Sequence, residues 1–194
     1  MIEYVRGHVA ELTPATVTID VNGVGYLMNI SLATFTALEH KEDARVLVHE
    51  AIREDAYVLY GFADEQERSL FRLLIGVSGV GANTARMILS ALSTADLEQA
   101  ITSGDIKRIK TVKGIGAKTA ERIIVDLRDK IKPSDTIAVQ SDVPAASAAY
   151  EEALTALTVL GYARQQAQKV LKKIFDAEPT VKVEGAIRKA LAML

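Results

Sequence analysis

Two nearly matching nine-residue segments, set 35 positions apart, constrain the fold of this chain more than any other feature. Residues 77–85 read VSGVGANTA, and residues 112–120 read VKGIGAKTA. Each copy follows an apolar run with helical spacing, turns on Gly-(Val/Ile)-Gly, and continues through Ala and Thr into another apolar run. This order is typical of two helices joined by a tight turn. We therefore predict two successive helical hairpins between residues 77 and 124.

The glycines in both turns suit a backbone that binds phosphate groups. The unpaired N–H groups at a helix N-terminus match a phosphate well, and glycine lets that backbone come close and adopt positive φ. Val80 and Ile115, between the glycines, can point inward and anchor each turn. Such contacts are made to phosphates and not to bases, so they predict nucleic-acid binding without sequence specificity. One Gly-Val-Gly alone is explained equally well as a tight turn, but two matched copies favour a binding role.

The two copies differ in charge. Lys113, Lys118 and Arg122 surround the second turn, and the last two lie four positions apart on one helical face. The first copy has Ser78 and Asn83 in place of the two lysines, so its contacts would rely mostly on backbone amides. The predicted DNA-binding residues of the two copies are Gly79, Val80, Gly81, Asn83, Lys113, Gly114, Ile115, Gly116, Lys118, Thr119 and Arg122.

The distribution of charge places the basic residues around the second copy. The whole chain has 23 Lys and Arg against 25 Asp and Glu, which excludes a uniformly basic nucleic-acid-binding surface. Residues 1–62 carry a net charge of −5, whereas residues 105–132 carry +5. Any contact with phosphate is therefore expected to be local.

The composition also argues against a metal or redox site and against a membrane location. The chain has no Cys, and its three His residues show no metal-ligand spacing, so we expect neither a metal nor a cofactor. No apolar stretch approaches the roughly 20 residues of a membrane-spanning helix, and the N-terminus lacks the apolar core of a signal peptide. We expect a soluble, cytoplasmic protein.

The first 63 residues have the pattern of a small β-barrel. Residues 16–21 alternate with period two, Asn22-Gly23 is a strong signal for a tight hairpin, and residues 26–30 supply the returning strand. Further strands are predicted at 5–11, 45–53 and 57–62, with a helical turn near 34–38. Five short strands in this length favour a closed barrel of the oligonucleotide-binding type, with a sandwich fragment as the alternative.

Helices are predicted from residue 64 to about residue 132. Asp64 can cap the first helix with Glu67 three residues on, and a buried stripe follows at Leu70, Phe71, Leu73 and Leu74. Ser93 is a second N-cap, Gly104 ends that helix and Asp105 opens the next. This pattern gives about five helices arranged in two hairpin units.

The rest of the chain is predicted to be a tether and a small helical domain, which makes the overall fold class α+β. Residues 133–147 have the composition of a flexible linker. Helices are expected at 151–160, 164–175 and 183–194, within a domain that spans residues 148–194. A core this small suits the binding of a partner better than catalysis.

Two nucleotide-binding motifs are excluded by spacing, and one enzymatic alternative stays open. Ala117 separates Gly116 from Lys118, which breaks the Walker pattern, and Gly-x-Gly-x-x-Gly occurs at neither copy, so no ATP site is expected. A DNA glycosylase or nuclease that grips duplex DNA with the same hairpins is the alternative, with Asp126 or Asp129 as its carboxylate. Base flipping needs stacking side chains, and this chain has no Trp and few aromatic residues after position 71.

Several segments in order resemble the RuvA family, the Holliday junction-binding subunits of the bacterial branch-migration machinery. They are GVGY at 23–26, REDAxxLYGF at 53–62, the two glycine turns, KTAER at 118–122 and ALxxLGY at 156–162. The resemblance covers nearly the whole chain. It implies that four copies form a tetramer, or two tetramers face to face, that holds a four-way junction open and nearly planar.

The resemblance also assigns roles around the second predicted β-hairpin. Glu54 and Asp55 match the acidic pin of the family, which sits at the junction centre, and Arg53 beside them would be a phosphate contact. Carboxylates repel phosphates, so a pin can keep separated strands apart at the crossover. Without the resemblance, this acidic pair would be read as an ordinary polar turn.

The resemblance further implies that the C-terminal domain binds RuvB, a hexameric AAA+ motor that hydrolyses ATP, so no catalytic residue is expected in this chain. The same resemblance also allows the RuvC resolvase as a further partner. Candidate motor contacts, which could equally form the core of the domain, are Leu157, Leu160, Tyr162, Leu171 and Leu191. Many relatives carry lysine where Asn83 and Ala117 stand, which predicts weaker or more salt-sensitive binding of the arms.

Overall fold

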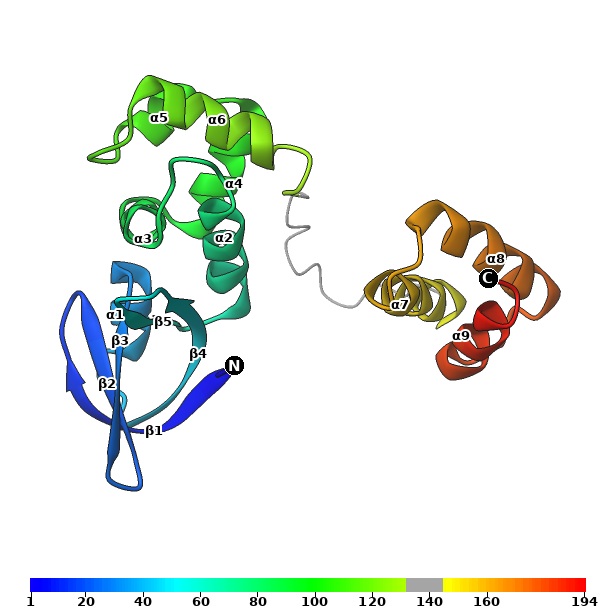
Figure 1. The fold of residues 1–194 in the computed structure, drawn as a ribbon, viewed down its shortest axis with the longest axis horizontal. Helices are drawn as coiled ribbons and strands as arrows, with labels where there is room; N and C mark the ends of the chain where they lie inside the picture. The colour runs from blue at the N-terminus through cyan, green and yellow to red at the C-terminus, as the bar shows by residue number, and fades with distance from the viewer. Residues whose placement is uncertain (132–144) are drawn as a thin grey trace. The chain divides into compact units, whose positions relative to one another are not determined.

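The computed structural model describes residues 1–131 and 145–194, which belong to two compact units (Figure 1). We call the first the barrel–hairpin unit and the second the C-terminal unit. Residues 133–144 of the predicted linker lie outside the described residues. The last three residues of that predicted segment begin the helix α7 (Ala145–Val159).

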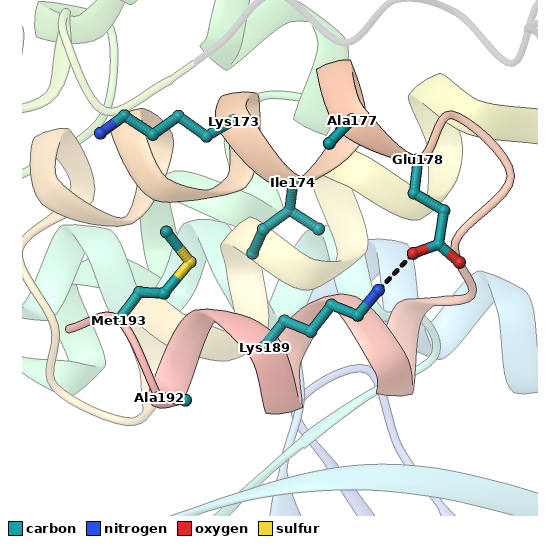
Figure 2. Close-up of a pocket in the computed structure, with 7 residues that line it drawn as sticks. All are labelled: Lys173, Ile174, Ala177, Glu178, Lys189, Ala192 and Met193. Atoms are coloured by element: carbon teal, nitrogen blue, oxygen red, sulfur yellow. Dashed lines mark hydrogen bonds and ion pairs between the residues drawn. The ribbon is translucent and has the colours of Figure 1, made fainter.

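The C-terminal unit consists of three helices around their own core. After α7 come α8 (Arg164–Ala177) and α9 (Val183–Leu191), as the sequence predicts. Gly161 turns the chain between the first two with a φ of 96°, a conformation that suits glycine. A groove of about 400 Å³ lies along α8 and α9, as Figure 2 shows, and an ion pair between Glu178 and Lys189 closes one end. Its lining residues are Lys173, Ile174, Ala177, Glu178, Lys189, Ala192 and Met193.

The barrel–hairpin unit opens with a closed five-stranded barrel, which confirms the barrel prediction and excludes the sandwich fragment. The strands are β1 (Tyr4–Leu12), β2 (Thr16–Val21), β3 (Val24–Asn29), β4 (Asp43–Ile52) and β5 (Tyr57–Phe62), with the short helix α1 (Leu32–Leu38) between β3 and β4. Their order round the barrel is β1-β2-β3-β5-β4, and the parallel pair β3–β5 closes it.

Local sequence explains the first hairpin of the barrel. Asn22 and Gly23 both have positive φ, at 53° and 87°, and the Asp20 carboxylate accepts a hydrogen bond of 2.8 Å from the Gly23 N–H. A two-residue turn of this kind matches the twist of the strands and sets their register. Alternate residues such as Val17 and Ile19 then face the barrel core, where they are fully buried.

Five helices follow between residues 64 and 131. They are α2 (Glu65–Ile75), α3 (Ala82–Ala91), α4 (Thr94–Ser103), α5 (Ile106–Lys110) and α6 (Ala117–Leu127). The predicted caps are confirmed, because Asp64, Ser93 and Asp105 each accept a hydrogen bond from the backbone N–H three residues on. Gly104 ends α4 in the left-handed conformation, with a φ of 76°.

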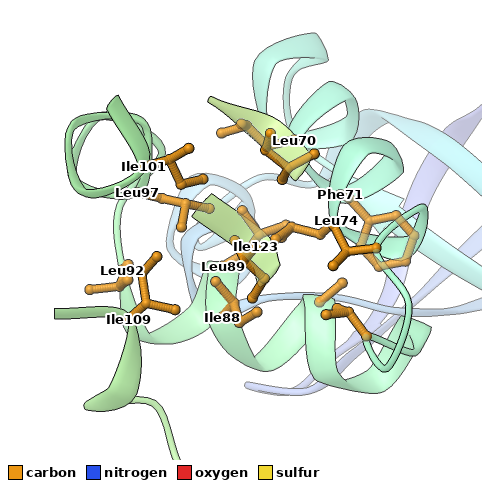
Figure 3. Packing of buried hydrophobic residues seen from close by; sticks show 14 of the residues in the cluster. Leu70, Phe71, Leu74, Ile88, Leu89, Leu92, Leu97, Ile101, Ile109 and Ile123 are labelled. Carbon is orange, nitrogen blue, oxygen red and sulfur yellow. The ribbon is translucent and has the colours of Figure 1, made fainter. Parts of the chain in front are cut away.

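The core of these helices is continuous with one side of the barrel. Figure 3 shows Leu70, Phe71 and Leu74 of α2 facing Ile88, Leu89 and Ile123 from the two hairpin helices. The Phe71 ring packs against β4 and β5, with ring centroids 5.3 Å from His49, 5.1 Å from Tyr60 and 4.9 Å from Phe62. Phe71 therefore joins the barrel to the helices that carry the glycine turns.

The second half of the predicted capping box has a different role from the one expected. Asp64 caps α2, but the buried Glu67 carboxylate accepts hydrogen bonds from the hydroxyls of Ser31 and Thr34 at the start of α1. Burial raises the pKa of Glu67 above its ordinary value, and the two hydroxyl hydrogen bonds oppose that rise. Glu67 therefore links α2 to α1, a long-range contact that no local pattern indicates.

Candidate nucleic-acid interface

The two glycine turns have almost the same backbone geometry. Gly79 and Gly114 both have a φ of 90°, and the N–H of the next residue closes each turn onto the carbonyl three residues back. Gly81 and Gly116 are the N-caps of α3 and α6, with φ and ψ of −84° and 169° in the first and −80° and 168° in the second. The repeated sequence therefore folds into a repeated structure.

The turns point their apolar residues inward and their glycines outward. Val80 and Ile115 are buried in the helical core, as predicted, whereas all four glycines are exposed. A Cβ added at Gly79, Gly81 or Gly116 would meet nothing within 4 Å. At Gly81 and Gly116 φ is also negative, so neither packing nor backbone conformation requires glycine there. What glycine provides at these two positions is an unobstructed backbone.

The N-termini of the hairpin helices are the uncapped ones in this part of the chain. Between residues 64 and 131, side chains cap α2, α4 and α5, while α3 and α6 begin without a side-chain cap. The first N–H groups of an α-helix have no partner within the helix. These groups stay available at both glycine turns, together with the positive end of each helix dipole.

The two turns are neighbours within the unit. The Arg122 guanidinium on α6 donates a long hydrogen bond of 3.5 Å to the carbonyl oxygen of Ser78 in the first turn. A Cβ on Gly114 would lie 3.8 Å from the Met87 methyl group on α3. The sequence pattern assigns Arg122 to the second copy alone, whereas in the structure it links the two copies.

The cations around the second turn are exposed and unpaired. Within residues 1–131 and 145–194, Lys113, Lys118 and Arg122 form no ion pair. Arg108, by contrast, is held by Asp96 at 2.7 Å. Thr119 of the candidate set is half-buried. The exposed Lys107 and Lys110 on α5 extend the same basic region. In the sequence, only their positive charge indicates that they could contact phosphate.

The first turn is fixed to the barrel by contacts that the sequence pattern does not indicate. The Tyr60 hydroxyl donates to Asn83 Oδ1 at 3.3 Å, and Arg86 donates to the carbonyl of Ile30 at 3.2 Å. The Leu32 N–H donates to the Ser90 hydroxyl at 3.2 Å. Because α3 is held at three points, the first turn has a defined position relative to the barrel.

Arg53 lies beside this first turn, although 28 positions separate it from Gly81. The two line a groove of about 190 Å³ together with Ala51, Ala56, Val58, Tyr60, Ala82, Asn83 and Thr84. The groove brings one guanidinium group, one amide side chain and the uncapped start of α3 together. The fold thus unites candidate residues from the barrel and from the first copy.

Glu54 and Asp55 form the exposed tip of the β4–β5 hairpin. The Arg53 N–H donates to the Ala56 carbonyl at 2.8 Å, which closes the turn around them. We call residues 52–57 the acidic hairpin. Asp126 and Asp129, the carboxylates of the enzymatic alternative, are also exposed, on α6 and in the turn after it. An exposed carboxylate on a helix does not provide the enclosed pocket that base flipping needs.

Each of the three parts of the chain matches known proteins. Family models match residues 1–61 (RuvA N terminal domain), 71–129 (SAM-like Helix-hairpin-helix tandem) and 148–194 (RuvA, C-terminal domain). Proteins from Bacteroides thetaiotaomicron, Bacteroides fragilis and Christiangramia forsetii are 55%, 54% and 46% identical to it, with 100% of both chains covered. Each of these relatives is a Holliday junction branch migration complex subunit RuvA.

The chain belongs to the RuvA family. The RuvA N-terminal match covers all of the barrel except its last residue, Phe62, and includes the acidic hairpin. The helix-hairpin-helix match contains both glycine turns. The resemblance drawn from the sequence is thereby confirmed.

The RuvA C-terminal match contains the five candidate partner contacts, which the structure divides into two groups. Leu157 and Leu171 are fully buried in the core of the C-terminal unit, so they are not available to a partner. Leu160 and Leu191 are 60% and 42% exposed, and Tyr162 is half-buried. The groove along α8 and α9 has no signal in the sequence, because it depends on how two helices pack.

No group of three His, Cys, Asp or Glu side chains among the described residues is arranged to hold a metal ion. Within the same residues, no helix is both long and apolar enough to cross a membrane.

Proposed function

We propose that this RuvA family protein binds four-way DNA junctions through the phosphate backbone of the arms, as a non-catalytic subunit for a motor that moves the junction. The main support for this proposal is the pair of uncapped helix N-termini, each preceded by an outward-facing glycine turn. A phosphate can approach each turn closely and accept hydrogen bonds from several backbone N–H groups. Two adjacent turns follow successive phosphates along one arm.

The two turns differ in the side chains that would contact phosphate. At the second turn, the exposed Lys113 and Lys118 form no ion pair among the described residues and add positive charge. At the first, Asn83 and Arg53 border one groove, where a phosphate of the strand approaching the crossover would bind. Contacts of this kind carry no base information, which suits a protein that must act on junctions of any sequence.

The acidic hairpin gives the site its second function. Glu54 and Asp55 are exposed at its tip, and phosphates of strands that meet at a crossover would be repelled by them. We infer that the two carboxylates keep the strands apart at the centre while the glycine turns hold the arms. Arg53, at the base of the same tip, provides the adjoining attraction.

Holding four arms requires several copies of the chain, and we propose a homotetramer built through the barrel, or two such tetramers face to face. Large apolar side chains exposed on the barrel support this arrangement, because contact with another copy would remove their surface from water. They are Tyr4, Val24, Leu27 and Leu32. The mass of the complex with and without junction DNA distinguishes the tetramer from the octamer.

The C-terminal unit is the proposed docking site for the RuvB motor, and Leu160 and Leu191 are its most exposed candidates. Hydrolysis of ATP is assigned to that motor. RuvC is proposed as a further partner on the same junction. The proposed location is the bacterial cytoplasm, where the DNA is.

Phosphate binding at the two uncapped helix N-termini can be tested by replacing the two N-cap glycines. The double variant Gly81→Val/Gly116→Val should fold normally, because φ is negative and nothing lies within 4 Å of either added Cβ. Each valine would nevertheless stand between the helix N-terminus and an incoming phosphate. We expect a modest fall in the thermal unfolding midpoint, because valine is a poorer N-cap residue than glycine. The affinity for a four-way junction should fall at least about tenfold. Unchanged affinity in a folded variant would exclude the glycine turns as the phosphate sites.

The acidic hairpin is tested by Glu54→Gln/Asp55→Asn, which removes both charges and keeps the shape. Junction affinity should stay the same or become tighter, since the variant no longer repels phosphate. A 2-aminopurine base beside the crossover, which brightens when unstacked, should be dimmer in the bound junction, and motor-driven migration should be altered. If fluorescence and migration both match those of the natural sequence, the hairpin has no part in strand separation.

A further inference from the structure

The acidic hairpin projects from the barrel as a ribbon of only two strands. β4 pairs with β1 as far as Leu47, and one more backbone hydrogen bond, 3.0 Å from the Val48 N–H to the Glu3 carbonyl, extends that contact. Beyond it β4 pairs with β5 alone, out to Ile52 and Tyr57. Because β5 also pairs with β3 at Leu59, opposite Glu50, the ribbon has only two strands beyond that pair. A two-stranded ribbon is marginally stable in water, so the direction of its tip depends on how it is held. On one face Ala51 and Val58 pack against the helical core, and the base of the ribbon is held by other contacts.

Glu50 occupies that base and contacts both the ribbon and the N-terminal segment. Its Oε1 accepts a hydrogen bond of 2.5 Å from the Tyr57 hydroxyl, across the ribbon on the strand that returns from the tip. Its Oε2 accepts one of 2.9 Å from the Ile2 backbone N–H and lies 3.8 Å from the N-terminal amine. These hydrogen bonds hold the pKa of Glu50 below its ordinary value, with the one from Tyr57 as the largest cause.

The N-terminal segment is itself anchored. The Ile2 side chain packs against the barrel core. The buried Arg68 of α2 donates hydrogen bonds to the Glu3 carbonyl at 2.9 Å and to the Val48 carbonyl at 3.4 Å, and it pairs with the Glu3 carboxylate. A connected series of contacts therefore runs from α2 through residues 2–3 to Glu50 and across to Tyr57.

We propose that Glu50 is a positioning residue, which fixes the direction of the acidic hairpin relative to the helices that bind the arms. The proposal rests on the strand-separating function of Glu54 and Asp55 proposed above. Exposed ion pairs contribute little in general. Glu50 differs from them because its side chain is only 11% exposed and because one of its partners is a backbone N–H. The Tyr57 side chain is 58% exposed, so burial holds it little, and its hydroxyl is hydrogen-bonded to Glu50.

The test uses Glu50→Ala, Tyr57→Phe and the double variant, each compared with the natural chain. We expect both single variants to lose a similar part of the 2-aminopurine brightening at the crossover, and the double variant to lose no more, because the two residues act through one contact. Junction affinity should change less than about threefold. Glu42→Ala, an exposed barrel glutamate outside the hairpin, controls for the loss of one negative charge and should keep the full brightening.

The outcomes separate this proposal from the function on which it depends. Full brightening with Glu50→Ala, while Glu54→Gln/Asp55→Asn dims the crossover, would overturn the positioning role alone. Unchanged brightness with Glu54→Gln/Asp55→Asn would exclude strand separation as the function of the acidic hairpin, and would therefore also exclude this proposal. If Glu50→Ala lowered junction affinity and the thermal midpoint together with the brightness, its role would be general stability, which also overturns positioning. Losses in the double variant equal to the sum of the single losses would contradict the shared contact.

Discussion

Replacing Lys113 and Lys118 with alanine should lower the affinity for a four-way junction by about tenfold or more at moderate salt. Both side chains are exposed beside the second glycine turn and form no ion pair among the described residues, so their charge is available to phosphate. The dependence of the logarithm of affinity on the logarithm of salt concentration should also flatten, by about one unit for each phosphate that the variant no longer neutralises. Mobility-shift titrations at several salt concentrations measure both quantities.

The matched control for this prediction is Lys169→Ala/Lys172→Ala. These two lysines are exposed on α8 of the C-terminal unit, so their removal changes the net charge equally without touching the glycine turns. We expect the control to bind with nearly the natural salt dependence. If the slope for Lys113→Ala/Lys118→Ala equalled that of the control, the two side chains would not contact phosphate.

Replacing Phe71 with alanine should lower the free energy of unfolding of the barrel–hairpin unit by about 3–5 kcal/mol. The ring is fully buried and packs against three aromatic rings of β4 and β5, so its removal opens a cavity between the barrel and the helices. Urea unfolding followed by circular dichroism measures the change. The C-terminal unit has its own core, and its transition should not move.

Phe35→Ala is the matched control for Phe71→Ala. Phe35 is only half-buried and packs against the barrel core alone. Its removal should therefore cost clearly less stability and leave the packing between barrel and helices intact. An equal decrease in stability for both variants would mean that Phe71 has no special role at the join between the two parts.

The features that could be predicted from the sequence are those fixed by a few neighbouring residues. The Asn22-Gly23 turn, the three N-caps and the two glycine turns each depend on backbone preferences within four or five residues, and all are found as predicted. The inward direction of Val80 and Ile115 follows from the same local pattern. The number and length of the strands favour the closed barrel that the structure has.

The features that escaped prediction are side-chain contacts between distant parts of the chain. Glu67 follows the pattern of a capping box, yet its carboxylate binds α1, because burial against Ser31 and Thr34 outweighs the local preference. Arg122 reaches Ser78 across 44 positions, and Arg86 reaches Ile30 across 56. Which of the C-terminal leucines face solvent is likewise decided by the packing of three helices.

Junction binding is tested most directly by comparing the affinity of the 194-residue chain for a four-way junction with its affinity for a linear duplex of equal length. Both should be measured at one fixed salt concentration, because phosphate contacts are salt-dependent. We expect clearly tighter binding to the junction, with no base release and no strand cleavage in the absence of a partner. Equal affinity for the two DNAs would contradict this expectation.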